Sequence, residues 1–481
     1  MNKQPKIFLT LGILVILISS LTAMALSEGS AAREIVRTIA IKTIQAVGES
    51  RASAFIIRSL SQRNTNNNPR IIQQAVVMTH DGLLAYTDKL VYQSGEIPNL
   101  FVRASTEYSV EIFVIEDGAF KRLTQKWSHK SENIGDIVFD TFAGFSSSDF
   151  DLIKLDRTNK SGWHQAIVVS GVKKLHIPFF VEKLNNHDVL FVESTDTLKA
   201  YRSAGDMRTF YHPQPQQLMG AFTRPRGYPI NYEIKLYNSA PDDLDCADHL
   251  INADFVLKAG LDQLSITYDV VSDEFLDNSE NLKRYRMIIL GTHNEYWTAQ
   301  KISRIKRYVD QGGSLLILGG NTAWRWVARS SGMDVIWGDG ILKDDERYYS
   351  FLTTILGSYY DGRGYGTYAP FQLLDGMHLI DDSLKNTKVF GRGTTFAGCK
   401  DKVAGASGHE TDKIYEKSQG FTVIANGLNE GGSSGAQIVY RRLGNEGRGQ
   451  VLNFGSLSLW HRIDDPVIKS LIRNFYRESE E

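Results

Sequence analysis

Two short apolar runs, each followed at once by a polar turn, constrain the fold of this chain more than any other feature. Residues 287–290 read MIIL and lead into GTHNEYWT at 291–298. Residues 314–318 read SLLIL and lead into GGNTAW at 319–324. Such runs are typical of strands covered on both faces of a parallel sheet. Because ligands bind at the carboxyl ends of parallel strands, we expect a functional site at these two turns.

The surrounding pattern alternates strands with helices. Strands are predicted at 188–192, 264–268, 286–290, 314–318 and 450–454, and helices at 244–260, 298–311 and 465–476. Gly260 is the expected C-cap of the first helix, and Gly312 and Gly313 follow the second. Alternation of this kind predicts parallel βαβ units. Residues 340–460 are glycine-rich, and we expect them to be irregular.

An all-β region precedes this part. Short alternating runs such as 75–78, 109–114 and 165–169 are separated by turns, which is typical of a β-sandwich. The predicted fold class is therefore α/β plus β. It has a flavodoxin-like or glutamine-amidotransferase-like parallel sheet at 186–481, a β-sandwich-like domain at 70–185 and an N-terminal hydrophobic helix.

The N-terminus is predicted to be a targeting segment. Lys3 and Lys6 precede an uncharged, mostly apolar stretch at residues 7–26, and an Ala-Met-Ala sequence offers a cleavage site. A run of about 20 apolar residues is also long enough to span a bilayer, so residues 1–26 are either a signal peptide or a membrane anchor. Both alternatives place the protein outside the cytoplasm, either anchored in the membrane or periplasmic or secreted. Residues 30–63 are expected to form a helical stalk.

Composition excludes several classes of protein. Across 481 residues the net charge is -1, which argues against a nucleic-acid partner. The two cysteines, Cys246 and Cys399, have no zinc-site or CxxC spacing, and whether they pair stays open. No GxSxG or GxGxxG sequence lies between a predicted strand and a predicted helix, so neither a nucleophile elbow nor a dinucleotide-binding turn is predicted. We expect a small-molecule substrate, and a homo-oligomer is possible.

Polar residues near predicted strand ends form the candidate site. Tyr201 follows the 188–192 strand, Asp273 follows 264–268, His293 and Glu295 follow 286–290, and Asn321 follows 314–318. His293 and Glu295 are two residues apart, so in extended backbone both side chains point the same way. Such oxygen and nitrogen donors suit a Lewis-acidic metal ion, and an acid/base pair without metal is the alternative.

Simpler interpretations of these residues stay open. A His-x-Glu sequence at a strand end is often only a hydrogen-bonded turn, and Gly-Gly-Asn is often only a tight turn. Tyr296 and Trp297 are expected to pack under the loop. A second polar cluster, GHETD at 408–412, is expected to be a turn around a hydrogen-bonded glutamate.

At these residues the chain resembles the C-terminal region of the N,N-dimethylformamidase large (beta) subunit family. The family's Gly/Ser-His-x-Glu-Tyr-Trp motif corresponds to residues 291–297 here, and its Gly-Gly-Asn turn to residues 319–321. Its Ala-Tyr segment corresponds to residues 200–201, followed by Tyr211. Arg224, Pro225, Gly455, Ser456 and Trp460 match in order, and the resemblance covers residues 155–478.

The resemblance implies an amide hydrolase with a mononuclear iron held by two tyrosine phenolates and a glutamate. Carried over, Glu295 is the glutamate ligand, Tyr201 is one phenolate and His293 lies beside them as a further candidate ligand. The second phenolate position is Trp163 here, which cannot ligate a metal, and the adjacent His164 should point to the opposite face of its strand. Asn321 is expected to orient the substrate carbonyl.

Two other functions are alternatives to a metal-dependent hydrolase of a C–N bond. One is a non-catalytic, membrane-tethered binding or structural protein that retains the fold without the metal site. The other is a glycan-binding protein using Trp324 and Trp326, although aromatic residues at such positions usually belong to the core.

Overall fold

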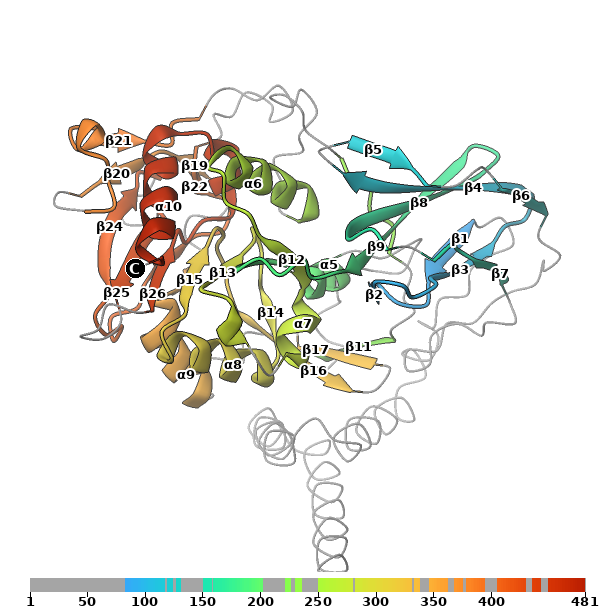
Figure 1. Cartoon of the computed structure of the whole chain (residues 1–481), viewed down its shortest axis with the longest axis horizontal. Coiled ribbons are helices and arrows are strands. Elements are labelled where there is room, and N and C mark those ends of the chain that lie inside the picture. Colours follow the sequence, from blue (N-terminus) through green and yellow to red (C-terminus); the bar gives the residue numbers. More distant parts are fainter. Residues whose placement is uncertain are drawn as a thin grey trace, which may run out of the picture.

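The structure is a computed structural model (Figure 1). It describes residues 83–116, 119–123, 127–130, 150–157, 159–201, 221–225, 230–235, 250–279, 282–330, 333–337, 346–361, 367–374, 378–393, 405–429, 435–442 and 449–480. The predicted leader at 1–26, the predicted stalk at 30–63 and the predicted strand at 75–78 lie outside these residues. None of the helices described is long and apolar enough to cross a membrane.

The N-terminal part contains two sheets that face each other (Figure 1). A three-stranded sheet has the order β1-β3-β7, and a six-stranded sheet has the order β2-β9-β8-β4-β5 with β6 paired to β4. The strands are β1 (Leu84–Thr87), β2 (Val91–Gln93), β3 (Asn99–Arg103), β4 (Glu107–Glu116), β5 (Ala119–Arg122), β6 (Trp127–Lys130), β7 (Asp151–Lys154), β8 (Gly162–Ser170) and β9 (Lys173–Glu182).

Strict alternation of side chains builds the core of these two sheets. In β4 buried residues alternate with partly exposed ones, because successive side chains of a strand point to opposite faces. Val110 and Ile112 of β4 share one apolar cluster with Leu100 and Val102 of β3. The two sheets are therefore held together by one core.

A nine-stranded sheet organises the C-terminal part, in the order β12-β10-β13-β15-β26-β25-β24-β20-β21. The first five strands are parallel to one another, and the remaining neighbours are antiparallel. These strands are β10 (Val189–Glu193), β12 (Asp269–Ser272), β13 (Met287–Leu290), β15 (Ser314–Ile317), β20 (Phe371–Leu373), β21 (Val389–Phe390), β24 (Thr422–Gly427), β25 (Gln437–Arg442) and β26 (Gln450–Asn453).

Helices cover both faces of the parallel strands, which is why those strands are apolar throughout. Met287 and Ile289 pack into the cluster with α6 (Ile251–Gln263) and α10 (Pro466–Glu478). Ile288 and Leu290 pack into the cluster with α7 (Asp273–Asn278), α8 (Ala299–Asp310) and α9 (Glu346–Phe351). A strand buried on both faces needs apolar side chains at consecutive positions.

Local signals set the ends of α8. The Thr298 side chain caps its first turn by accepting a hydrogen bond from Lys301 N at 3.0 Å. Two residues beyond its last residue, Gly312 has a φ of 101°, a backbone conformation that favours glycine. The helix predicted at 298–311 is thereby confirmed, and its buried apolar side chains include Ile302, Ile305 and Val309.

Shorter elements complete the fold. A four-stranded sheet has the order β11-β17-β16-β14, and two-stranded sheets pair β18 with β23 and β19 with β22. They comprise β11 (Ala221–Pro225), β14 (Tyr296–Trp297), β16 (Arg325–Ser330), β17 (Met333–Trp337), β18 (Ser358–Tyr360), β19 (Tyr368–Ala369), β22 (Ser407–Gly408) and β23 (Asp412–Ile414). The remaining helical segments are α5 (Thr195–Tyr201), η2 (Leu282–Arg284), η4 (Leu352–Leu356), η5 (Asp382–Leu384) and η7 (Leu457–Arg462).

The predicted fold class is wrong for the chain as a whole. In the described part strand residues outnumber helical ones, and they form several sheets. The central sheet is mixed rather than parallel, because residues 371–442, expected to be irregular, add four antiparallel strands to it. The predicted N-terminal hydrophobic helix is not part of the described fold.

Two element boundaries were also predicted wrongly. The strand expected at 264–268 begins at Asp269, after a turn in which Ser265 adopts a φ of 59°. Gly260 lies inside α6 rather than at its end. A Cβ there would come within 2.4 Å of Ile463, so close packing explains this glycine.

Candidate active site at the strand ends

The loop after β13 is anchored by a buried carboxylate of α6. Gly291 directly follows the strand, and a Cβ at this position would lie 2.5 Å from Asp254 Oδ1. That same oxygen accepts a hydrogen bond from Thr292 N at 2.7 Å. The absence of a side chain at Gly291 therefore lets Asp254 fix the start of the loop that carries the candidate site.

Three of the sequence-predicted residues meet at one carboxylate. The side chains of His293 and Glu295 are buried, and His293 Nε2 lies 3.3 Å from Glu295 Oε2. The Tyr201 hydroxyl, at the end of α5, donates to the same oxygen at 2.7 Å. Arg325 Nε donates to the other oxygen, Oε1, at 3.0 Å. Residues far apart in the sequence thus converge on Glu295, with the Arg325 guanidinium balancing its charge.

A second carboxylate, Glu410, reaches the same imidazole from the loop between β22 and β23. Glu410 Oε2 lies 3.3 Å from His293 Nε2 and accepts a 2.6 Å hydrogen bond from Asn321 Nδ2. The loops approach closely, since a Cβ on Gly320 would lie 2.9 Å from the carbonyl oxygen of Glu410. The predicted hydrogen-bonded glutamate at 408–412 is therefore also a member of the site.

Asn321 combines backbone strain with a buried polar atom that has no described partner. Its φ is 52°, and its backbone N–H donates to Asp412 Oδ1 at 2.8 Å. Its side-chain Oδ1 is buried and accepts no hydrogen bond from the described residues. An unsatisfied buried acceptor of this kind fits a donor on a bound molecule. Left-handed backbone outside glycine is concentrated at functional sites.

The charges of the site shift its proton equilibria. Burial lowers the pKa of His293, but the hydrogen bonds and charges of Glu410 and Glu295 outweigh it and raise that pKa to about 9. Burial and the same two carboxylates raise the pKa of Tyr201 well above its usual value. Burial likewise raises the pKa of Asp412 to about 7. Without a bound cation, the site therefore holds an imidazolium and a neutral phenol.

The donor set fits a hard metal ion, with one condition. Glu295 Oε2 lies 2.7 Å from the Tyr201 hydroxyl oxygen and 3.3 Å from His293 Nε2. Two neighbouring ligand atoms, each bound to a metal ion at about 2.1 Å, are about 3 Å apart, so these distances suit ligands of one ion. In the described part of the chain, no group of three histidines, cysteines, aspartates or glutamates is arranged as a metal site. A metal here would therefore depend on the Tyr201 phenol.

Trp163 and His164 do not join these donors. The Trp163 indole packs edge-on against Phe180 and is buried in an apolar cluster, and its Nε1 has no described partner. On the opposite face of β8, His164 stacks on Phe179. Burial lowers the pKa of His164 to about 4, so this histidine is a neutral core residue.

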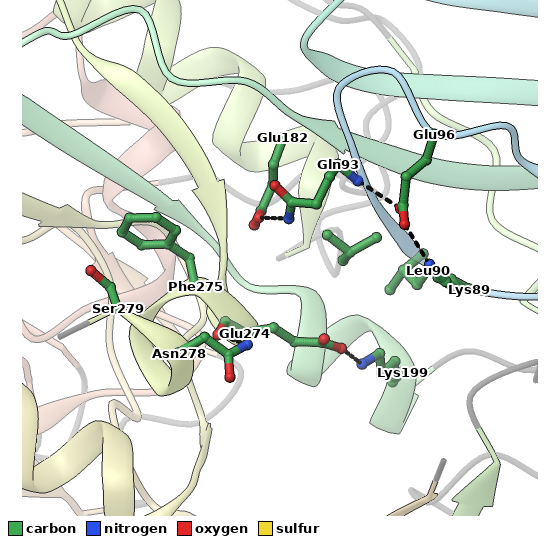
Figure 2. A pocket seen from close by; sticks show the side chains of 11 residues that line it. Lys89, Leu90, Gln93, Glu96, Glu182, Lys199, Glu274, Phe275, Asn278 and Ser279 are labelled. Atoms are coloured by element: carbon green, nitrogen blue, oxygen red, sulfur yellow. Dashed lines mark hydrogen bonds and ion pairs between the residues drawn. The ribbon is translucent and has the colours of Figure 1, made fainter. Parts of the chain in front are cut away.

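A cavity of about 390 Å³ lies between β2 and the helices α5 and α7 (Figure 2). Its charged side chains pair across short distances, Lys89 with Glu96 at 2.8 Å and Lys199 with Glu274 at 2.7 Å. Gln93 donates to its third carboxylate, Glu182. Because the charged side chains that line this cavity all have partners, none of them calls for a charged ligand.

Other residues that the sequence singled out lie elsewhere. Asp273 opens α7 and pairs with Lys301 rather than with the site. Tyr296 and Trp297 are buried under the loop, as expected. Trp324 packs edge-on against Tyr360. Cys246, Cys399 and Tyr211 lie outside the described residues.

Sequence reasoning missed Glu410, Arg325 and Asp412 as site residues. The only signal for Glu410 was a glutamate beside a histidine in a glycine-rich segment, and its distance along the chain concealed its place. Arg325 follows the Gly-Gly-Asn turn, so its proximity to the site could have been inferred from the turn itself.

A buried cluster of phenol, imidazole and carboxylates at the ends of parallel strands defines a polar site with the features of an active centre. The chain belongs to the family described as N,N-dimethylformamidase beta subunit-like, C-terminal, whose model matches residues 153–467. This range contains all the residues of the site. The resemblance inferred from the sequence is thereby confirmed.

Comparison with curated proteins found no matching relative. Solved structures with similar parts include a β-galactosidase from Bacillus circulans sp. alkalophilus, at 14% identity over 48% of this chain and 27% of that chain, with a TM-score of 0.31. A putative ThuA-like protein from Bacteroides uniformis has 15% identity over 53% of this chain and 95% of that chain, with a TM-score of 0.30. The chain spans about a quarter of the length of that β-galactosidase.

Proposed function

We propose that this chain hydrolyses the C–N bond of small linear amides, with a metal ion held by Tyr201, Glu295 and His293. The convergence of these three side chains on one buried carboxylate oxygen carries the proposal. Family membership supports it, because the name of the family refers to an amidase. By the resemblance, the metal is iron.

A bound metal ion would polarise the amide carbonyl and lower the pKa of a water molecule. The residues of the chain would do the remaining work. Glu410 takes a proton from the attacking water while the water oxygen forms a bond to the carbonyl carbon. Glu410 then gives this proton to the amide nitrogen as the C–N bond breaks, which yields a carboxylic acid and an amine. Asn321 holds Glu410 Oε2 in place, and its own Oδ1 can accept a hydrogen bond from the amide N–H.

A metal-free route uses the same residues as an acid/base pair. The imidazolium of His293 lies between two carboxylates and can protonate the leaving nitrogen, while Glu410 accepts the proton of water. After the reaction Glu410 carries a proton and His293 is neutral. Transfer of this proton from Glu410 to His293, whose atoms lie 3.3 Å apart, restores the starting charges. The dependence of activity on added metal separates the two routes.

Release of amine from a panel of small N-alkyl amides tests the proposal. We expect hydrolysis by the iron-loaded full chain and a loss of about 10³-fold in kcat/KM for Glu295→Gln. Glu416→Gln is the matched control, because Glu416 is an exposed glutamate six residues after Glu410. This variant should keep full activity. Equal rates in wild type and Glu295→Gln would refute the assignment.

A second candidate function is a binding or structural protein that has lost the chemistry. The observation in its favour is Trp163, buried where the family resemblance places a metal-binding tyrosine. Absence of amide hydrolysis together with absence of bound metal would favour the binding protein.

We also propose that the chain is exported, on the basis of residues 1–26 alone.

A further inference from the structure

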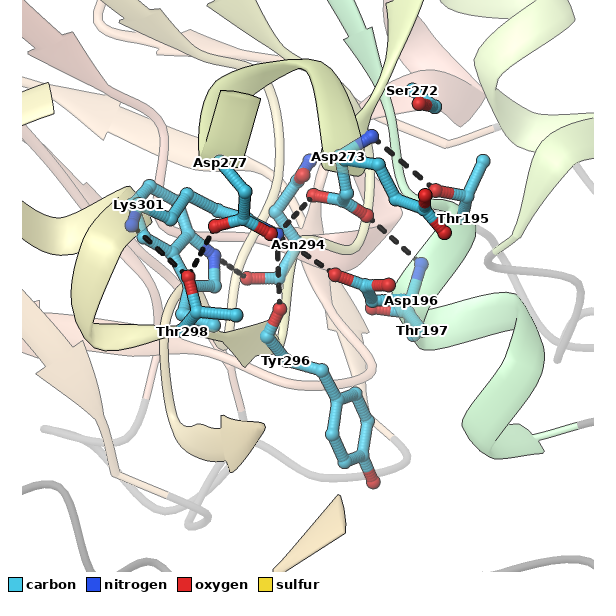
Figure 3. A network of polar contacts seen from close by, with 12 residues as sticks. Thr195, Asp196, Thr197, Ser272, Asp273, Asp277, Asn294, Tyr296, Thr298 and Lys301 are labelled. Carbon is cyan, nitrogen blue, oxygen red and sulfur yellow. Dashed lines mark hydrogen bonds and ion pairs between the residues drawn. The ribbon is translucent and has the colours of Figure 1, made fainter. Parts of the chain in front are cut away.

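A fully buried lysine lies behind the site, on the first turn of α8. The Lys301 side chain has an exposure of 0%, and its ammonium group contacts three oxygen atoms (Figure 3). These are Asp273 Oδ1 at 2.8 Å, Asp196 Oδ2 at 3.0 Å and the Tyr296 carbonyl oxygen at 3.4 Å. An ammonium group has three N–H donors, so this arrangement uses all of them. We call Lys301, Asp196 and Asp273 the lysine cluster.

Each of the three contacts leads toward a residue of the site. Asp196 lies on the first turn of α5, the helix that ends at Tyr201. Tyr296 directly follows Glu295 in the loop. Asp273 closes the arrangement, because its Oδ2 accepts a 3.0 Å hydrogen bond from Asp196 N.

Neutral hydrogen bonds reinforce the same connections. Thr197 Oγ1, also on α5, accepts a hydrogen bond from Glu295 N at 3.2 Å. Thr195 Oγ1 accepts one from Asp273 N at 3.3 Å. The N-terminal turn of α5 is therefore tied to the start of α7 and to the loop that carries Glu295 (Figure 3).

Because α5 is short, its position depends on these hydrogen bonds and ion pairs. It has seven residues, and a helix this short has little stability of its own in water. Tyr201 lies five residues after Asp196, about 7.5 Å along the helix axis. A shift or rotation of the first turn would thus be carried directly to the phenol.

We infer that Lys301 is a positioning residue, which holds Tyr201 and Glu295 at hydrogen-bonding distance by binding α5, α7 and the site loop together. It touches neither substrate nor metal. Its effect on catalysis would come entirely from the separation of Tyr201 Oη and Glu295 Oε2, which is 2.7 Å in this structure.

Variants that remove the charges while preserving the size of the side chains test this inference. Asp196→Asn keeps the shape of one partner. The triple variant Lys301→Met, Asp196→Asn, Asp273→Asn leaves no unpaired buried charge, so it should fold even if Lys301→Met alone does not. Lys306→Met is the matched control, since Lys306 lies on the same helix and pairs with Asp310 at the surface.

Crystal structures of the metal-free variants give the first measurement. We expect the Tyr201–Glu295 hydrogen bond to be lost in the folded triple variant and kept in Lys306→Met. A folded triple variant with that contact still at 2.7 Å would overturn the inference. This structural result does not depend on whether the protein hydrolyses amides.

Kinetics give the second measurement, which rests on the proposed function. We expect kcat for amide hydrolysis to fall by about 100-fold in Asp196→Asn, because a displacement of about 1 Å has effects of that size. KM should change little, since no group of the lysine cluster contacts the substrate. An unchanged kcat in a folded Asp196→Asn variant would refute the positioning role, whereas inactivity of the wild type would refute only the proposed function.

Discussion

Two buried charged clusters flank the loop at 291–298, and they are built in different ways. In the lysine cluster, one ammonium group lies between Asp196 and Asp273. In the Glu295 cluster, formed by Tyr201, His293, Glu295 and Glu410, two carboxylates meet around one imidazole. The only guanidinium found there among the described residues, that of Arg325, is partly exposed.

The two clusters also differ in strain and in unsatisfied groups. Around the Glu295 cluster, Asn321 and Ala323 in the turn at 319–324 and His409 beside Glu410 adopt left-handed backbone. Asn321 also carries a buried oxygen without a described partner. No residue of the lysine cluster has a positive φ. We infer that the lysine cluster stabilises the fold, and that the Glu295 cluster is held in a costly arrangement for its chemistry.

The largest expected effect is on stability, from Lys301→Met. Removing the lysine leaves the buried Asp273 without its cation and leaves Asp196 with only Lys199, at 3.7 Å, which should lower the free energy of unfolding by about 3–5 kcal/mol. Urea denaturation at pH 7 measures this. Lys306→Met should stay within about 0.5 kcal/mol of wild type. If Lys301→Met lowered the free energy of unfolding as little as this control does, the lysine cluster would not be a stabilising element, and this difference between the two clusters would not exist.

A slightly smaller effect is expected from pH, in the metal-free protein. The pKa of His293 is raised to about 9, so its stabilising contribution is complete below about pH 6.5 and is lost as the pH rises through 9. A shift from 6.5 to about 9 corresponds to about 3 kcal/mol. The measurement is the free energy of unfolding at pH 6 and pH 10, in wild type and in His293→Gln.

The variant should lack this decline, and the difference between the two proteins isolates His293. Burial raises the pKa of Asp412 to about 7, which produces a separate loss of stability as the pH rises from about 4 to 7; because the charge of His293 lowers this pKa, the loss reaches higher pH in His293→Gln. Identical declines above pH 6.5 in the two proteins would show that His293 is not held as an imidazolium.

Glu410→Gln should lower kcat/KM for amide hydrolysis by about 100-fold, because it removes the proposed proton acceptor. The hydrogen bond from Asn321 can be kept by the glutamine oxygen, but part of the negative charge that raises the pKa of His293 is lost, so the stability of the metal-free protein should also fall at pH 7. Steady-state kinetics across pH 6–10 measure the effect, with Glu416→Gln as the control. Full activity of Glu410→Gln would exclude this glutamate from the reaction.

The smallest effect is expected from Lys89→Met, in the cavity of Figure 2. Lys89 and Glu96 are both about 40% exposed, so their pairing should contribute less than about 1 kcal/mol. Amide hydrolysis should be unaffected. A strong loss of activity with unchanged stability would move the functional site from the strand ends to this cavity.

The sequence predicted the parts of the site that depend on local pattern. Consecutive apolar residues at 287–290 are typical of a strand covered on both faces, and this placed His293 and Glu295 at its carboxyl end. The two-residue spacing then indicated that both side chains reach one centre. Tyr201 followed from the next strand of the sheet by the same argument.

The remaining parts depend on contacts that no local pattern encodes. Glu410 enters the site because short antiparallel strands bring residues 405–412 back against the Gly-Gly-Asn turn, and such glycine-rich strands have weak periodicity. The strands at 422–427 and 437–442 have apolar residues of their own but lie in a glycine-rich segment that was expected to be irregular, and missing them made the predicted fold class wrong. Lys301 lies in the helix predicted at 298–311, and only the tertiary structure shows that its side chain is buried.

Metal analysis of the purified full chain tests the central claim most directly. We predict about one iron per chain in the wild type and in Lys306→Met, and a large loss of iron in both Glu295→Ala and Tyr201→Phe. A wild-type protein without bound metal, or unchanged iron in the two site variants, would contradict the assignment of the Glu295 cluster as a metal-dependent hydrolase centre.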